Sequence, residues 1–117
     1  MDKDIYSVKR INRRIQISAE AETTLPDGTA VASQVFELSS GGCYIDTPKF
    51  IPVGTRLRLR ISKGMTVYEL PGKVIYTQPG FGIGVHGMGV AFEDLAEDKR
   101  LAIETWMRNL SNEETSN

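Results

Sequence analysis

The stretch that decides the fold is Thr55-Arg56-Leu57-Arg58-Leu59-Arg60-Ile61. Apolar side chains occupy every second position after the threonine, and arginines fill the positions between them. A strict period of two is typical of a strand with one face on a core and the other in water. We therefore predict a half-buried β-strand whose arginine row faces solvent, where cationic side chains also discourage edge-to-edge aggregation.

The same alternation continues on both sides of this strand. Residues 14–22 alternate apolar and polar side chains, and the turn Leu25-Pro26-Asp27-Gly28 leads into a returning strand over residues 29–38. These two strands are predicted to form a hairpin. The remaining short strands are predicted at residues 43–45, 66–70, 73–77 and 88–92, with Pro71-Gly72 separating the middle two.

Near the C-terminus the period changes to 3.6, which predicts a helix over about residues 94–110. Asp94 followed by Glu97 resembles an N-terminal capping pair. Six or seven short strands followed by one helix predict an antiparallel sheet that curls or closes, with the helix over one end or face. The apolar helix face, with a tryptophan expected to pack against the sheet, consists of Ile103, Trp106, Met107 and Leu110.

The composition is that of an ordinary soluble domain. A chain of 117 residues is long enough for one self-sufficient core, and a net charge of −1 gives no global attraction to DNA or to an anionic membrane. No run approaches the ~20 apolar residues of a membrane span, and the charged N-terminus does not lead into a signal-like apolar segment. The single cysteine, Cys43, excludes a disulfide framework and is expected in the core. We expect a cytoplasmic protein.

Two separate stretches carry side chains suited to an anionic ligand. The first is Lys9-Arg10-Ile11-Asn12-Arg13-Arg14. The planar fork of an arginine donates two parallel hydrogen bonds to a phosphate, and it can meet guanine O6 and N7 in the same way. Arg10, Arg13 and Arg14 could therefore clasp a nucleotide. Taken alone, however, such a run is more often a solvated basic arm without a ligand.

The second stretch is Glu37-Leu38-Ser39-Ser40-Gly41-Gly42. A carboxylate can accept hydrogen bonds from guanine N1–H and N2–H. The Ser39 hydroxyl and the backbone N–H groups that follow can hold a phosphate or a base edge, and the two glycines allow a tight turn whose amides form an anion-binding nest. Taken alone, a plain loop between strands is the commoner explanation.

Together, the two stretches resemble the signature of the PilZ domain family, which binds cyclic di-GMP. Arg10 and Arg14 match its RxxxR motif, and Ser39 and Gly42 match the end of its [DN]xSxxG motif. Pro71 to Tyr76 and Gly87 to Phe92 are similar to two later strands of the family. The resemblance covers roughly residues 9–110, and it leaves residues 1–8 as a flexible arm and residues 111–117 as a polar tail.

The resemblance implies a mainly β fold, a six-stranded antiparallel β-barrel with one C-terminal α-helix. It implies a cyclic di-GMP receptor that is not an enzyme and has no cofactor. Such a receptor would signal to an unidentified effector protein by ordering its N-terminal arginine arm, without binding DNA or inserting into a membrane. The implied ligand-binding residues are Arg10, Arg13, Arg14, Glu37, Ser39, Gly42 and Tyr76.

Two of these residues have alternative interpretations. Glu37 stands where the family has Asp or Asn, and one added carbon–carbon bond of about 1.5 Å displaces its carboxylate. Losing one bidentate base contact costs on the order of 1–3 kcal/mol, so an adaptor that binds no nucleotide and acts only through protein contacts is the alternative function. Tyr76 stands where the family often has an aromatic side chain that stacks on guanine. Its alternative is a ring in the core with only the hydroxyl at the surface.

Other motifs point to no further chemistry. Residues 82–87 match GxGxxG, but a strand rather than a helix follows them, so we predict a hairpin loop instead of a dinucleotide site. His86 is the only histidine and is expected in a surface loop, without a nucleophile or carboxylate partner.

Overall fold

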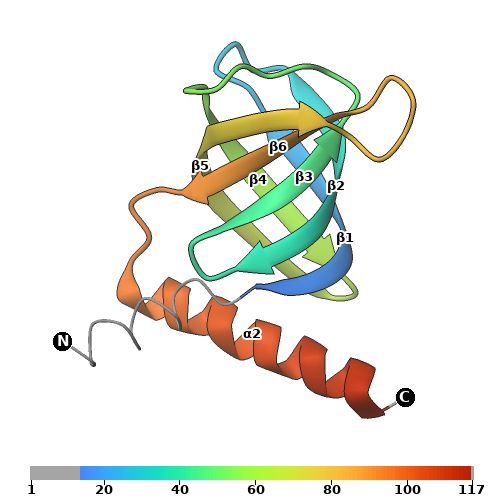
Figure 1. Cartoon of the computed structure of the whole chain (residues 1–117). Coiled ribbons are helices and arrows are strands. Elements are labelled where there is room, and N and C mark those ends of the chain that lie inside the picture. Colours follow the sequence, from blue (N-terminus) through green and yellow to red (C-terminus); the bar gives the residue numbers. More distant parts are fainter. Residues whose placement is uncertain (1–13, 117) are drawn as a thin grey trace, which may run out of the picture.

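The computed structural model describes residues 14–116 of the chain, and the side chains of residues 14–110. It is a closed barrel of antiparallel strands with one helix across its lower end (Figure 1). The strands are adjacent in the order β1-β2-β3-β6-β5-β4, which confirms the predicted six-stranded barrel. The elements are β1 Ile15–Thr24, β2 Ala30–Ser39, β3 Gly42–Thr47, β4 Arg56–Lys63, β5 Thr66–Pro79, β6 His86–Phe92 and α2 Glu97–Ser116.

The alternating strands fill the barrel with their apolar faces. In β4, Leu57, Leu59 and Ile61 are buried, as the period of two predicted. Burying one large aliphatic side chain contributes roughly 1.5–3 kcal/mol, so the inner faces supply most of the driving force for closure. The core side chains of the other strands include Ile17, Ala19, Ala21, Val35, Leu38, Ile45, Leu70, Val74, Met88 and Val90.

The arginine row of β4 lies on the solvent side of the barrel, as predicted. Arg60 is in register with Glu22 of β1 on one side and with Glu69 of β5 on the other. Arg56 pairs with Glu93, with 3.0 Å between Nε and the carboxylate Oε1. Arg56 and Arg60 of this row thus have acidic neighbours on the protein itself, and opposite charges at directly opposed strand positions are favourable.

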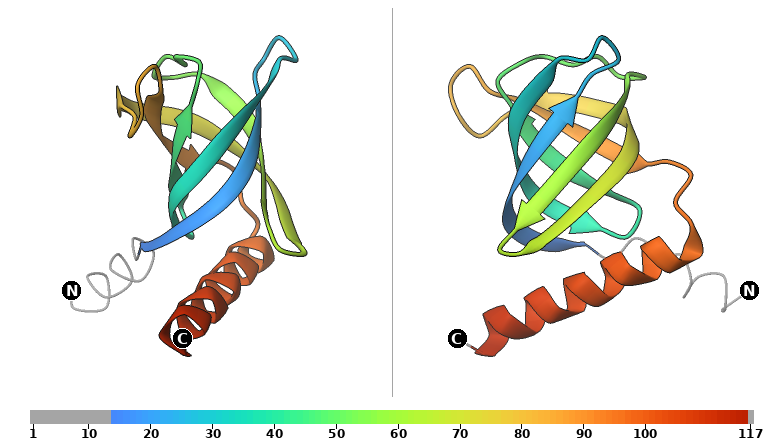
Figure 2. Two further views of the ribbon diagram at one scale, coloured as in Figure 1. Left: turned by 90° about the vertical axis from the view of Figure 1, so that its right-hand side faces the viewer. Right: turned by 180° about the vertical axis from the view of Figure 1, so that it is seen from behind.

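Helix α2 lies across one end of the barrel in every view (Figure 2). Its predicted apolar face is buried, with Ile103 1% and Met107 5% exposed. Trp106 packs against Tyr68 of β5 with 5.1 Å between ring centroids, and the Tyr68 hydroxyl donates to the carbonyl of Ala102. These contacts confirm that the tryptophan packs on the barrel.

Four local predictions were wrong. Pro71-Gly72 does not divide β5, because Gly72 pairs with both Leu57 and Phe92 and the Pro71 carbonyl accepts the Glu93 N–H. Asp94 has a φ of 53° and precedes the helix, so it is not a helix cap. Instead, the carbonyl of Ala96 accepts the Arg100 N–H.

The helix also ends at Ser116 rather than near residue 110, so it includes most of the expected tail. No glycine or proline follows Leu110 to stop it. His86 is the first residue of β6 rather than a loop residue, and its ring contacts that of Phe50. None of the helices in the described part of the chain combines the length and apolar character that a membrane crossing requires.

Candidate functional site

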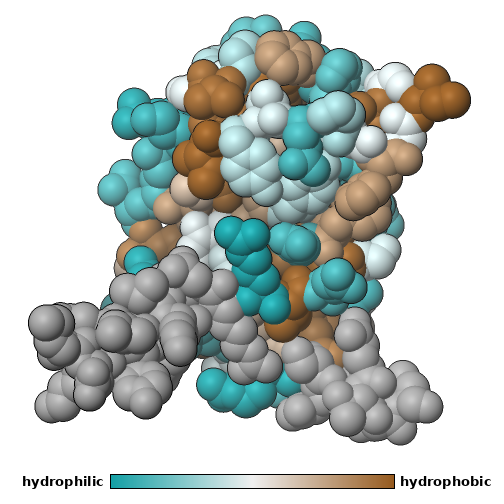
Figure 3. Space-filling view, in the orientation of Figure 1, coloured by the Kyte–Doolittle hydropathy of each residue, from teal (hydrophilic) through white to brown (hydrophobic). Residues whose placement is uncertain are grey.

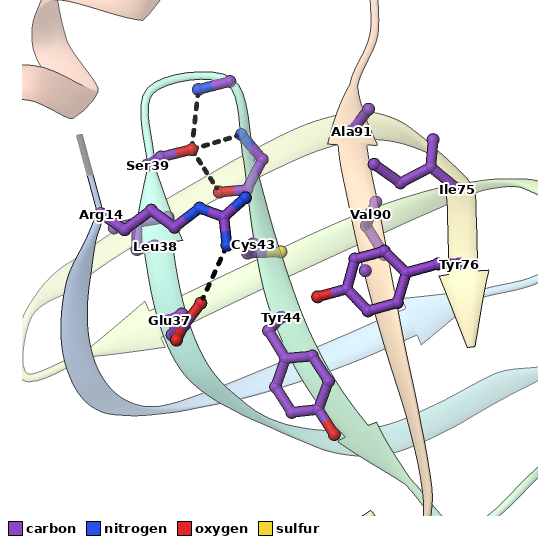
Figure 4. Close-up of a pocket in the computed structure, with 13 residues that line it drawn as sticks. Arg14, Glu37, Leu38, Ser39, Cys43, Tyr44, Ile75, Tyr76, Val90 and Ala91 are labelled. Carbon is purple, nitrogen blue, oxygen red and sulfur yellow. Dashed lines mark hydrogen bonds and ion pairs between the residues drawn. The ribbon is translucent and has the colours of Figure 1, made fainter. Parts of the chain in front are cut away.

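A pocket of about 250 Å³ lies on the outer face of the barrel, where β2, β3, β6 and β5 run side by side (Figure 4). It brings together all the predicted ligand-binding residues within the described chain, namely Arg14, Glu37, Ser39, Gly42 and Tyr76. Arg10 and Arg13 lie outside the described residues. The other lining residues are Leu38, Gly41, Cys43, Tyr44, Ile75, Gly89, Val90 and Ala91.

The tight turn between β2 and β3 is organised by Ser39. Its Oγ accepts the N–H groups of Gly41 and Gly42 at 3.2 and 3.1 Å, and it donates to the Gly42 carbonyl at 3.2 Å. The two amides therefore converge on one point, as a nest requires, and the serine oxygen occupies that point. A Cβ atom on Gly42 would overlap the Val90 carbonyl oxygen, so this glycine lets β3 approach β6 closely.

The charged wall of the pocket consists of Arg14 and Glu37. Their nearest charged atoms, Arg14 Nη1 and Glu37 Oε1, are 3.7 Å apart, and the side chains are 66% and 39% exposed. An exposed pair of this kind contributes about 1 kcal/mol or less. Both groups therefore remain available to a ligand that offers a phosphate to the arginine or a donor edge to the carboxylate.

The opposite wall is aromatic (Figure 4). The ring of Tyr76 lies against Gly89 of β6, where a Cβ atom would overlap the ring, and the side chain is 38% exposed. The ring therefore lies outside the barrel core. Next to it, the ring of Tyr44 from β3 covers Gly87 and is 6% exposed. The two rings are 6.5 Å apart with 19° between their planes.

Sequence reasoning missed Tyr44 as part of this wall. The signal that could have found it is the alternation of Gly87 and Gly89 along β6, which leaves one face of that strand bare. A bare strand face between two neighbouring strands can receive flat rings from both of them. Tyr44 and Tyr76 supply those rings from β3 and β5, the two neighbours of β6.

The floor of the pocket is apolar. Cys43 lines the pocket there and is buried, and this burial raises the pKa of its thiol well above the usual range. The thiol is therefore neutral and acts as a small hydrophobic group, as expected from the sequence. A cationic wall, an aromatic wall and an apolar floor together suit a ligand with a flat ring and a negative group.

Residues 82–85 of the glycine-rich run form most of the connection between β5 and β6, which confirms the predicted hairpin loop, and the run ends in the first two residues of β6. The Phe81 N–H donates to Asp46 Oδ2 at 2.8 Å and so fixes this loop to β3. Among the residues that the structure describes, no three metal-ligating side chains come together.

Exposed hydrophobic side chains lie at the pocket and on the β5–β6 loop. Figure 3 shows hydrophobic patches on both flanks of the upper half of this face, with paler residues between them. Ile75, at the pocket, is 54% exposed, and Phe81 and Ile83 of the β5–β6 loop are 74% and 105% exposed. Apolar surface of this kind is typical of protein contact sites.

Solved structures with this fold include PilZ domains. The PilZ domain of YcgR from Escherichia coli, described with c-di-GMP, aligns with a TM-score of 0.76 and 16% identity over 89% of this chain and 92% of that one. The PilZ domain of CeSA from a cellulose-synthesizing bacterium aligns with a TM-score of 0.64 and 18% identity over 86% and 99%. The Bacillus subtilis inhibitor of motility MotI aligns with a TM-score of 0.68 and 14% identity over 85% of this chain and 50% of that one.

At sequence identities this low, the alignments show only that the fold is shared. No curated protein sequence matches the chain. The PilZ domain model matches residues 9–109, which is nearly the whole sequence. The chain therefore belongs to the PilZ domain family.

Proposed function

We propose that this protein is a receptor for cyclic di-GMP, without catalytic activity, that signals ligand occupancy to a separate effector protein. One observation carries the proposal. The fold places Arg14, Glu37 and Ser39 on one side of a pocket and a partly exposed Tyr76 ring on the other. Two of the structural neighbours, the YcgR PilZ domain and PlzA of Borreliella burgdorferi, are described with c-di-GMP.

Each wall suits one part of this ligand. Arg14 would meet a phosphate or a guanine O6 and N7 edge with its planar fork. Glu37 would accept from guanine N1–H and N2–H, and Tyr76 would stack on a base, an interaction worth about 1–3 kcal/mol. On the strength of the motif, we extend the site to Arg10 and Arg13. Ordering of the N-terminal arginine arm on binding would then be the signal to the effector, and a cytoplasmic location stays a prediction.

A second candidate function is an adaptor that does not bind nucleotide. The observation in its favour is that Glu37 already pairs with Arg14, with 3.7 Å between Oε1 and Nη1. A longer acidic side chain than the family pattern prefers would then satisfy the arginine internally. The exposed hydrophobic side chains near the pocket would serve protein contacts in either case.

Calorimetric titration with cyclic di-GMP separates the two functions. The wild type should bind with micromolar or tighter affinity, and Arg14→Ala should lose this binding. Arg58→Ala is the matched control, because it removes an exposed arginine from β4, away from the pocket. Absence of ligand-induced heat in the wild type would favour the adaptor, and release of a linear dinucleotide would contradict the non-enzymatic role.

A further inference from the structure

We propose that Tyr44 is a positioning residue of the ligand site, which sets the place of the Tyr76 ring and does not itself contact the ligand. The inference rests on the proposed receptor function. It concerns a row of four aromatic rings that runs from β2, through the β5–β6 loop, to the pocket, namely Phe36, Phe81, Tyr44 and Tyr76. We refer to these four residues as the aromatic row.

Tyr44 is the fixed member of this row. Its ring lies on Gly87, where even a Cβ atom would overlap the phenol, and it forms a T-shaped contact with the ring of Phe81, at 5.9 Å between centroids and 74° between planes. Its hydroxyl accepts a hydrogen bond from Gln78 Nε2 at 3.3 Å. A phenol is protonated at neutral pH and keeps its donor, and burial raises the pKa of this one further.

Tyr76 is held by fewer contacts. Its ring rests on Gly89, and among the described residues it stacks with the ring of Tyr44, at 6.5 Å between centroids and 19° between planes. With 38% of its surface exposed, it has room to leave this position when the neighbouring ring is removed. A stacking ring that must be ordered at the moment of binding lowers affinity, whereas one that is already held in place does not.

Tyr44 lines the pocket, but its burial leaves little of its surface for direct contact with a ligand. Only 6% of its surface is exposed, because its ring is surrounded by Gly87, Phe81 and Tyr76. Its influence on a bound base must therefore pass through the ring of Tyr76. This dependence distinguishes a positioning residue from one that binds the ligand or merely supports the barrel.

A double-mutant cycle on the full chain tests this dependence, with cyclic di-GMP as the titrant and circular dichroism to show that each variant is folded. Tyr44→Leu should weaken binding roughly three- to ten-fold, the cost of immobilising one side chain. In a Tyr76→Ala background, Tyr44→Leu should leave the affinity unchanged. Tyr44→Phe retains the ring and should bind within about two-fold of the wild type.

Equal losses from Tyr44→Leu in both backgrounds, or no loss in either, would overturn the proposal. If Tyr44→Leu does not fold, Phe81→Ala replaces it, because Phe81 is 74% exposed and its ring contacts that of Tyr44. Its effect must likewise vanish in the Tyr76→Ala background. Wild-type protein that gives no heat would reject the receptor function itself, an outcome seen before any variant is compared.

Discussion

The ring of Tyr76 lies directly on the backbone of Gly89, so that a single added methyl group would occupy the space of the ring. Gly89 and Tyr76 are also paired in register between β6 and β5. The glycine is therefore needed for the aromatic wall of the pocket, not for flexibility of β6. The family-like Gly-Met-Gly-Val run of this strand thus has a function in shaping the site.

Gly89→Ala should displace the Tyr76 ring and destabilise the protein. Forcing a methyl group into a filled space costs typically about 1–3 kcal/mol of unfolding free energy. Binding of cyclic di-GMP should weaken roughly ten-fold, within the range that base–aromatic stacking is worth. Denaturant unfolding and calorimetry measure the two effects.

Gly41→Ala is the matched control for stability. A Cβ atom at Gly41 meets no atom within 4 Å, and its φ lies outside the positive region. Its unfolding free energy should stay within about 0.5 kcal/mol of the wild type. A Gly89→Ala protein as stable as Gly41→Ala, with Tyr76 unmoved, would show that the close contact is not tight in solution.

Glu37→Asp tests whether one methylene group limits the site. Shortening the side chain should release Arg14 from the present ion pair and restore the carboxylate position that the family pattern favours. We expect cyclic di-GMP to bind to Glu37→Asp at least about ten-fold more tightly than to the wild type, since one good bidentate base contact is worth about 1–3 kcal/mol. Stability should hardly change, because an exposed pair contributes about 1 kcal/mol or less.

Calorimetry of wild type, Glu37→Asp and Glu37→Gln side by side provides the comparison. Glu37→Gln keeps the length of the side chain but removes its charge, and it should bind no more tightly than the wild type. Unchanged or weaker affinity in Glu37→Asp would mean that the turn already places Glu37 correctly.

The sequence could predict those features that depend on one segment of the chain or on two segments that follow one another. The alternation in β4 and the 3.6 period of α2 directly encode burial, so both faces were predicted correctly. The Arg14–Glu37–Ser39 cluster could be expected because β1 and β2 form a hairpin. These relationships involve segments that are neighbours in the chain.

The pairing of Tyr44 with Tyr76 could not be predicted in this way. The two rings meet only because β6 lies between β3 and β5, and that strand order requires a long connection. The predicted break between two strands at Pro71-Gly72 was wrong for a similar reason. Local turn chemistry suggests a break there, but partners on both β4 and β6 hold the segment extended.

Cys43 should be unreactive in the folded protein. Burial raises the pKa of its thiol, so at pH 8 almost no thiolate forms, and the side chain is 9% exposed. An aromatic disulfide reagent should react only as fast as the protein unfolds. Addition of guanidinium chloride should make the thiol fully reactive.

The same shift in pKa predicts a pH dependence of stability. Above about pH 8.5 the unfolded chain releases the thiol proton while the folded protein retains it, so the unfolding free energy should fall as pH rises. Cys43→Ala lacks this titration, and the stability difference between the two proteins should narrow with increasing pH. A constant difference from pH 7 to 10 would contradict the burial of the thiol.

Trp106 should be a main attachment point of α2. It is 8% exposed and packs on Tyr68, whose hydroxyl also bonds to the helix backbone at Ala102. Removing a buried tryptophan costs about 3–5 kcal/mol, so Trp106→Ala should shift the denaturation midpoint strongly. Leu101→Ala on the same helix removes a side chain that is 53% exposed and should cost less than about 1 kcal/mol.

Because none of the described pocket-lining residues belongs to α2, Trp106→Ala that remains folded at low temperature should bind cyclic di-GMP as the wild type does. Weakened binding in that variant would instead mean that the helix contributes to the ligand site.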